Sequence, residues 1–315
     1  MNFHAILRNM TEIIYKDRAS GEIKKEKVYG KFFLEALYGS GLFAKFCSIF
    51  FLPLISHIPF LSSLYGKRQK KEKSKKKIAP FIRDFKIDTT EFADPISHFR
   101  SFNDFFIRRL KPEARPIDPD EKKAILPADG RYLVFPDLSK SRGFYVKGKK
   151  FDLRQLVGTK SDFELFKKGS MMIARLCPTD YHRFHFVCAC IPGEPRLING
   201  PLYSVNPIAL RKHISILNEN KRVMTLLDGG AFGKIGYLEV GATCVGSICQ
   251  TYTPKEVYKK GAEKGYFEFG GSCLILLFEP NKIEFDRDLV EASKKQIETY
   301  AKMGGSLGRC KSGSH

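Results

Sequence analysis

Alternating apolar and polar positions indicate a β-hairpin near the start of the chain. The sequence IIYKD at residues 13–17 and IKKEKVYG at residues 23–30 would form the two arms. Between them, ASGE supplies the small and polar residues that tight turns favour. We therefore expect residues 11–30 to fold as a hairpin.

A long uncharged segment, Phe46 to Leu64, is followed directly by the basic run KRQKKEKSKKK at residues 67–77. Its length approaches that of a transmembrane helix, but Pro53 and Pro59 would each remove a helical hydrogen bond inside the bilayer. The pattern favours a broken helical hairpin in the membrane interface, with the lysines on anionic headgroups. The residues expected to touch the membrane are Phe50, Phe51, Leu52, Lys70, Lys71, Lys75, Lys76 and Lys77.

The same two segments also fit a role away from the membrane. The uncharged segment could be a buried core hairpin, and the basic run could be a solvated surface. The basic run could also bind RNA, although no aromatic stacking motif accompanies the lysines.

The spacing of apolar positions changes from helical to β-type after Pro116. Helical spacing extends from about Ala79 to Phe106, with a break near Asp94 and Pro95. Short β-type runs then follow one another: RYLVF, GFYVKG, SMMIARL, FHFVCAC, PLYSV, KRVMTLL, GKIGYLEVGATCVGSI, GYFEF and CLILLF. We predict an α+β fold, with a helical, basic, membrane-associating region at 1–110 and a mostly antiparallel β core at 111–315.

Composition and charge indicate what class of partner the protein binds. The 315 residues are 43% hydrophobic and 28% charged, which suits a globular chain and excludes a disordered tail or a peptide hormone. The net charge of +20 predicts an anionic partner. Eight cysteines without a Cys-x-x-Cys pair, and an N-terminus without an apolar signal region, indicate a reduced protein on the cytoplasmic side.

Candidate chemistry lies in three segments, because the Walker, G-x-G-x-x-G, H-E-x-x-H and G-x-S-x-G signatures are absent from the sequence. They are LPADGRY at 126–132, CPTDYHRFHF at 177–186 and GYFEFGGSCLILLF at 265–278. Each alone could be structural: a turn, a core histidine pair and a hairpin at Gly270–Ser272. Together they supply a carboxylate that can orient a histidine, which takes a proton from a serine.

A zinc site is a weaker alternative at Cys188 and Cys190 with the nearby histidines. Cys-x-Cys alone is a poor metal pattern, so we expect no metal.

The surroundings of Ser272 suggest what its hydroxyl attacks. The apolar strand CLILLF follows it, rather than a helix whose N-terminus could support an oxyanion. Gly270 and Gly271 precede it and tolerate strained backbone conformations. Ser272 could therefore attack the carbonyl of Gly271. An N-to-O acyl shift, elimination to dehydroalanine and loss of ammonia would then leave a pyruvoyl group.

Five segments in this order resemble the pyruvoyl-dependent phosphatidylserine decarboxylase family, and the likeness covers nearly the whole chain. They are PADGR, TDYHRFHF, YSVNPIAL, EVGATCVGSICQTY and GYFEFGGS. The resemblance implies self-cleavage between Gly271 and Ser272 into a large chain, 1–271, and a small chain, 272–315. Ser272 would become the covalent pyruvoyl cofactor.

The resemblance also implies residue roles and partners. Asp129 and His185 would activate Ser272, and His182 would assist decarboxylation of phosphatidylserine to phosphatidylethanolamine through a Schiff base. It further implies a homodimer. With the basic and apolar segments, it places a peripheral enzyme on the cytoplasmic face of the cell membrane, without nucleic acid. Family members commonly have Thr or Ser where Cys273 stands, and we expect self-cleavage to proceed despite this difference.

Two further function classes remain. Ser272, His185 and Asp129 could form a hydrolase triad for external esters, which would leave the chain whole. Alternatively, the protein could be a basic membrane- or RNA-binding module without catalysis.

Overall fold

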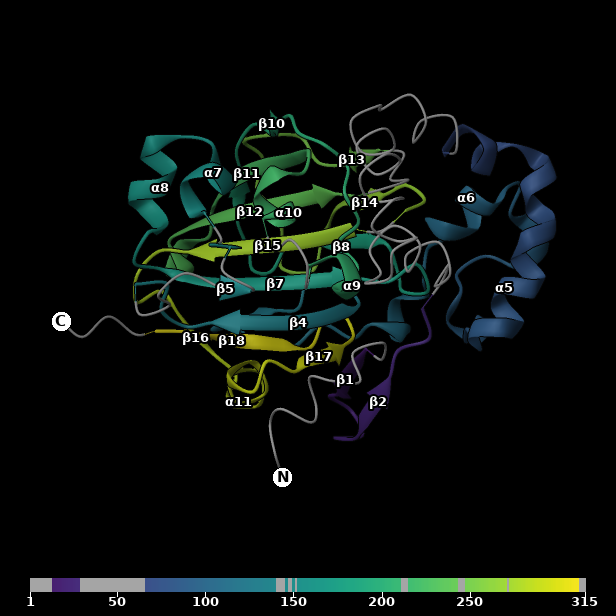
Figure 1. Cartoon of the computed structure of the whole chain (residues 1–315), viewed down its shortest axis with the longest axis horizontal. Coiled ribbons are helices and arrows are strands. Elements are labelled where there is room, and N and C mark those ends of the chain that lie inside the picture. Colours follow the sequence, from purple (N-terminus) through teal and green to yellow (C-terminus); the bar gives the residue numbers. More distant parts are fainter. Residues whose placement is uncertain are drawn as a thin grey trace, which may run out of the picture.

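A twisted sheet of ten strands crosses the molecule in the computed structural model (Figure 1). The structure describes residues 13–28, 66–139, 145–146, 149–150, 152–210, 215–242, 247–270 and 272–311. The strands of the sheet are β1 (Ile14–Asp17), β2 (Ile23–Lys25), β4 (Gly130–Phe135), β7 (Ser170–Leu176), β9 (Ile191–Pro192), β10 (Arg196–Ile198), β11 (Arg222–Asp228), β12 (Lys234–Gly241), β15 (Ser272–Phe278) and β17 (Glu298–Ala301).

The strand order is β10-β11-β12-β15-β7-β4-β17-β1-β2, with β9 also paired to β11. Neighbouring strands are antiparallel except β1 and β17, which are parallel. The expected mixed α+β fold with mostly antiparallel strands is therefore confirmed. The expected hairpin is confirmed too, since β1 and β2 pair in antiparallel register.

Strand β15 lies inside this sheet, between β12 and β7, and is buried on both faces. Alternate residues of a strand point to opposite faces, so Leu274 and Leu276 enter one core while Ile275 and Leu277 enter the other. This two-sided burial explains why CLILLF is a continuous apolar run.

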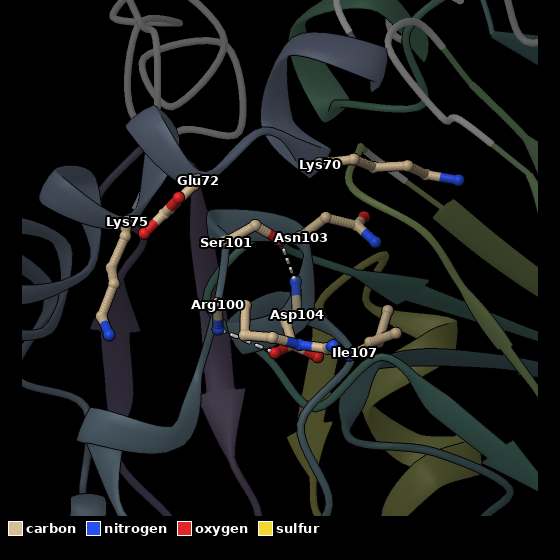
Figure 2. A pocket seen from close by; sticks show the side chains of 8 residues that line it. All are labelled: Lys70, Glu72, Lys75, Arg100, Ser101, Asn103, Asp104 and Ile107. Atoms are coloured by element: carbon tan, nitrogen blue, oxygen red, sulfur yellow. Dashed lines mark hydrogen bonds between the residues drawn. The ribbon is translucent and has the colours of Figure 1, made fainter.

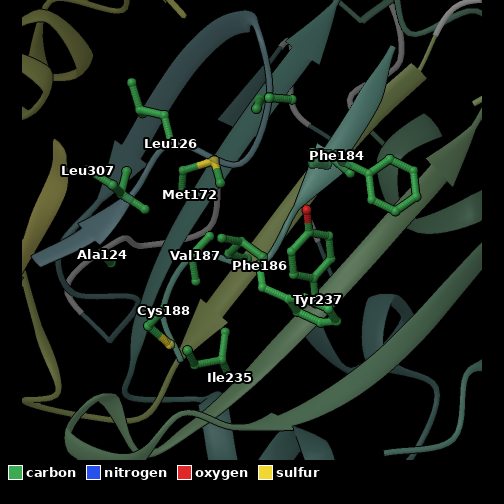
Figure 3. Packing of buried hydrophobic residues seen from close by; sticks show 14 of the residues in the cluster. Ala124, Leu126, Met172, Phe184, Phe186, Val187, Cys188, Ile235, Tyr237 and Leu307 are labelled. Carbon is green, nitrogen blue, oxygen red and sulfur yellow. The ribbon is translucent and has the colours of Figure 1, made fainter. Parts of the chain in front are cut away.

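The first core lies between this sheet and two smaller sheets. Figure 3 shows Phe184 beside Tyr237 of β12 in this core, with ring centroids 6.2 Å apart. One small sheet contains β13 (Ile248–Gln250), β14 (Glu263–Phe267) and β8 (Arg183–His185). The other contains β16 (Ile283–Phe285), β18 (Ser306–Cys310) and β3 (Lys123–Ile125).

The second core includes residues of four helices on the other face of the sheet. These are α7 (Leu153–Val157), α8 (Lys160–Phe166), α9 (Pro207–Leu210) and α10 (Ile216–Glu219). Elsewhere, α11 (Arg287–Lys294) packs on β4 and β17, η5 (Gly230–Phe232) precedes β12, and β5 (Tyr145–Val146) pairs with β6 (Lys149–Lys150).

Residues 66–114 form a helical region at one side of the sheet, where Figure 1 labels α5 and α6. It contains η1 (Glu72–Lys77), α5 (Ile78–Phe85), η2 (Thr89–Glu91), η3 (Ile96–His98), α6 (Phe102–Phe106) and η4 (Pro112–Ala114). The expected helix over 79–106 is therefore wrong in its middle part. Lys86 adopts a left-handed conformation that ends α5, and Asp88 then caps a short 3-10 turn.

One predicted strand is also wrong. Residues 201–205, PLYSV, are irregular in the structure. The side chain of Asn220 bonds to both the backbone N–H and the carbonyl of Tyr203, at 3.1 and 2.7 Å. A side-chain amide thus satisfies backbone groups that a neighbouring strand would otherwise pair.

The segment 42–64, with Phe50, Phe51 and Leu52, lies outside the described residues, and so does Gly271. Among the residues that are described, no helix combines the length and apolarity that crossing a bilayer requires.

Candidate active site

Two of the expected site residues lie at one edge of the large sheet. Ser272, the first residue of β15, pairs with Leu176 at the end of β7. Asp129 directly precedes β4, which pairs with the other side of β7. Since adjacent strands are about 4.8 Å apart, this register places the backbones of Ser272 and Asp129 roughly 10 Å from each other.

The histidine segment starts from the same edge, because it follows β7 directly. The carbonyl of His182 accepts a 2.9 Å hydrogen bond from the N–H of Phe267, the last residue of β14. Residues 268–271, here called the linker, then lead to Ser272. The structural alternative of a hairpin at Gly270–Ser272 is wrong, because β14 and β15 belong to different sheets.

The hydroxyl of Ser272 is fully enclosed, with 0% exposed surface for the residue. Within the described residues its Oγ has no hydrogen-bond partner. Gly270, two residues earlier, has a φ of 151°, which L-residues rarely adopt. An external ester has no access to a hydroxyl that is enclosed in this way.

His182 presents a free acceptor nitrogen. Its Nδ1 lies 3.0 Å from the carbonyl oxygen of Asp180, which can only accept, so Nδ1 carries the proton. The Nε2 atom therefore bears a lone pair, and it has no partner among the described residues. Burial lowers the pKa of His182 to about 3, and the ring of Phe106 packs on the imidazole at 3.9 Å. The neutral ring can take up a proton at Nε2.

His185 is neutral for the same reason but is fully hydrogen-bonded. Its Nδ1 donates to the carbonyl of Gly261 at 3.0 Å, and the Tyr181 hydroxyl donates to Nε2 at 3.3 Å. Burial lowers the pKa of His185 to about 4, although the Gly261 carbonyl and the charge of Glu263 oppose this shift.

Asp129 is held by an arginine rather than by the histidine. Arg115 donates to both carboxylate oxygens at 2.8 and 2.5 Å, and the backbone N–H of Met303 donates at 2.9 Å. In the described part of the chain Asp129 makes no hydrogen bond to His185, but its negative charge acts on that imidazole. The two groups are therefore coupled by charge and not by a direct bond.

The N-terminal hairpin stabilises the start of the histidine segment, residues 177–186. Glu26, just after β2, forms ion pairs with Arg131 and Arg175, at 3.1 and 2.7 Å. Burial opposes the charge of Glu26, but the two arginines outweigh it, so its pKa lies below the usual value. Arg131 also pairs with Asp180, whose carboxylate accepts from the N–H of Cys177 at 2.6 Å.

Helix α6 contacts the linker. The side-chain oxygen of Asn103 accepts from the N–H of Phe269 at 2.9 Å, and Lys70 pairs with Glu268 at 2.6 Å. A pocket of about 550 Å³ lies beside these contacts, and Figure 2 shows the side chains that line it. Its lining residues are Lys70, Glu72, Lys75, Arg100, Ser101, Asn103, Asp104 and Ile107.

The expected membrane-binding lysines lie on the helical segment next to this pocket. Lys70, Lys71, Lys75, Lys76 and Lys77 are all exposed. Three of them also make contacts, since Lys70 pairs with Glu268, Lys75 bonds to the Ser97 carbonyl and Lys77 to the Gln69 side chain.

Three buried cysteines of the described chain, Cys273, Cys188 and Cys190, lie in apolar surroundings. Cys273 is buried in the second core, and burial raises the pKa of its thiol. It therefore packs as a small neutral side chain. Cys188 and Cys190 lie in the first core, and no three His, Cys, Asp or Glu side chains of the described chain converge as metal ligands. The zinc alternative thus finds no ligand set there.

A family model described as phosphatidylserine decarboxylase matches residues 102–309, which include all the predicted catalytic residues. The chain belongs to the phosphatidylserine decarboxylase family. A protein of Chlamydia pneumoniae named phosphatidylserine decarboxylase proenzyme is 47% identical over 291 residues, covering 91% of this chain and 95% of the relative. Proteins of the same name from Chlamydia caviae and Chlamydia muridarum are 47% and 44% identical, and each match covers 95% of this chain.

The family resemblance is thereby confirmed, while the roles of individual residues stay predictions. The sequence patterns do not single out Arg115, Tyr181 or Arg108 as site residues, although these residues lie around the predicted ones. No local signal distinguishes these two arginines among the 54 lysines and arginines of the chain.

Proposed function

We propose that this chain is a lyase that converts phosphatidylserine to phosphatidylethanolamine and CO2, using a pyruvoyl group made from Ser272 by self-cleavage after Gly271. One observation carries the proposal: in a chain of this family, the Ser272 hydroxyl is fully buried and has no partner within the described residues. Such a hydroxyl is suited to react with its own backbone, because the reactants are already held together.

Self-cleavage balances without any external reactant except water. Ser272 Oγ bonds to the Gly271 carbonyl carbon while the bond from that carbon to the Ser272 nitrogen breaks, which gives an ester. Loss of the Ser272 α-proton expels the Gly271 carboxylate as the end of the large chain and leaves dehydroalanine. Water then displaces ammonia, and the pyruvoyl group heads a small chain of 44 residues, 272–315.

The histidines have separate proposed tasks. His185, under the charge of Asp129, would take the proton of the Ser272 hydroxyl. His182 would take up a proton at Nε2 from the substrate ammonium as the Schiff base forms and return it to the substrate carbon, a role that typically contributes about 10²–10⁴-fold. When formed, the pyruvoyl group supplies the electron sink for the pair left as CO2 departs.

The substrate determines the proposed location. A diacyl lipid stays in the bilayer, so the active site has to reach the headgroup plane. Residues 1–110, with the exposed lysines and the apolar residues Phe50, Phe51 and Leu52, would hold the enzyme on the cytoplasmic face as a peripheral protein. Residues 111–315 would form the catalytic domain. The resemblance also suggests a homodimer of cleaved protomers, which light scattering would test.

Mass spectrometry of the purified full-length chain, combined with a phosphatidylserine turnover assay, tests the function. We expect a 44-residue fragment with a blocked N-terminus, and a Ser272→Ala variant that stays whole and inactive. The matched control is Ser170→Ala, a buried serine on neighbouring β7, which should cleave normally. An uncut chain that still turns over phosphatidylserine would overturn the proposal.

A further inference from the structure

Arg108 is a buried cation without an acidic partner. The residue is 5% exposed, and no ion pair joins it to another described residue. Its Nη atoms make only long hydrogen bonds, of 3.3 to 3.5 Å, to the backbone carbonyls of Phe105, Thr179 and Asp180. Its Nε has no partner among the described residues. A buried guanidinium with spare donors is unfavourable unless an anion binds there.

Arg108 lies next to His182, the residue proposed to return a proton to the substrate. The carbonyl oxygen of Asp180 accepts from Arg108 Nη2 at 3.3 Å and from His182 Nδ1 at 3.0 Å. The rings of Phe92 and Phe105 lie 5.1 and 5.0 Å from the guanidinium carbon. These contacts hold the guanidinium in one orientation beside the imidazole.

We propose that Arg108 binds the phosphodiester of the lipid headgroup, an inference that rests on the decarboxylase function proposed above. The planar guanidinium matches the oxygens of a phosphate or a carboxylate. The substrate contains both groups, but its carboxylate loses its charge as CO2 leaves. A cation on the carboxylate would stabilise the ground state more than the transition state, whereas the phosphodiester keeps its charge throughout.

This role predicts a specific kinetic change. Arg108→Gln should cleave itself normally and keep its kcat, while KM for phosphatidylserine in mixed micelles rises about 10- to 100-fold, as expected for loss of a charge-assisted hydrogen bond. Arg109→Gln is the matched control, since it removes the same charge from the adjacent exposed residue and should leave KM unchanged. A fall in kcat with unchanged KM, or an equal effect of Arg109→Gln, would overturn the inference.

Glycerophosphoethanolamine distinguishes the two anions, because it carries the phosphodiester and the amine but no carboxylate. Its inhibition should weaken in Arg108→Gln by the same factor as KM rises. Unchanged inhibition together with raised KM would assign Arg108 to the carboxylate and contradict the proposal.

Self-cleavage of two Arg108 variants distinguishes a purely structural role from the proposed one. If Arg108→Gln does not cleave, Arg108→Lys, which keeps the charge but not the planar fork, should cleave and show an intermediate KM. Failure of both variants to cleave would make Arg108 structural and overturn the inference. A wild-type chain that neither cleaves nor decarboxylates would instead overturn the proposed function.

Discussion

Asn103 of α6 accepts a 2.9 Å hydrogen bond from the backbone N–H of Phe269, three residues before Ser272. The rings of Phe102 and Phe106 contact the ring of Phe269, with centroids 5.2 and 5.0 Å apart. In turn, the Ser74 hydroxyl in the basic run accepts from the N–H of Phe102 at 2.9 Å. The basic run, α6 and the linker are therefore directly connected.

Removing this hydrogen bond should slow self-cleavage. Asn103→Leu leaves the buried N–H of Phe269 without an acceptor, which should cost about 1–3 kcal/mol and loosen the linker. Asn103→Asp keeps the acceptor oxygen and should cleave close to the wild-type rate. A gel time course of newly made protein measures the rate. Asn218→Leu is the control, because Asn218 is also buried but donates to Gln155 instead. Wild-type cleavage by Asn103→Leu would exclude this role.

Mutation should distinguish the roles of the two histidines. His185→Ala should slow or stop cleavage. His182→Ala should cleave, yet lose about 10²–10⁴-fold in decarboxylation, because the acceptor Nε2 is gone. Fragment mass and phosphatidylethanolamine yield are the two readouts, and exposed His98→Ala serves as control. If His182→Ala cleaves and retains full turnover, its assigned role is wrong.

The folded protein should become less stable as the pH falls. Burial holds the pKa of His182 at about 3 and of His185 at about 4, whereas histidines of the unfolded chain protonate near pH 6.5. Between pH 6.5 and these lower values the unfolded state binds more protons, so the free energy of unfolding decreases as pH falls. At pH 5 each histidine should account for about 2 kcal/mol of this loss.

Urea unfolding of the uncleaved Ser272→Ala protein at about pH 7.5 and about pH 5, on either side of the unfolded-state value, measures this effect. Adding His185→Asn should reduce the difference in unfolding free energy between the two pH values, while adding His98→Asn should not. The same difference in all three proteins would contradict the pKa assignment.

A buried ion pair should contribute to the packing of β12 against β14. Lys264 and Glu239 are both 0% exposed, and Nζ lies 2.6 Å from Oε1. Lys264→Met leaves the carboxylate uncompensated and should destabilise the protein by about 3–5 kcal/mol. The double variant Lys264→Met/Glu239→Leu should recover most of this loss, because both charges are then absent. Urea midpoints that do not differ between the single and double variants would disprove this account.

The basic run should control binding to anionic vesicles. Lys71 and Lys76 are exposed, and replacing both by Gln should weaken binding about 10- to 30-fold at roughly 1 kcal/mol per charge. Lys294 and Lys295, exposed at the end of α11, give the matched control. Cosedimentation of Ser272→Ala protein with phosphatidylserine vesicles measures the affinity. Equal weakening by both pairs would mean that only net charge matters.

The sequence alone determined the class of fold and the family, and it proposed the residues of the site. Ser272, His182, His185 and Asp129 could be proposed because they stand in the short local patterns that carry the family resemblance. The antiparallel core could be predicted from period-two alternation and from apolar runs such as β15, since burial acts on each strand locally.

Only the tertiary structure decided which groups meet. Asn103 and Phe269 are 166 positions apart in sequence, and Arg115 and Asp129 are 14 positions apart, with β3 between them in the chain. A partner selected by the packing of distant segments leaves no local pattern in the sequence. For the same reason β14 and β15, which are adjacent in sequence, looked like a hairpin. Long-range strand pairing placed them in different sheets, with the linker passing between them.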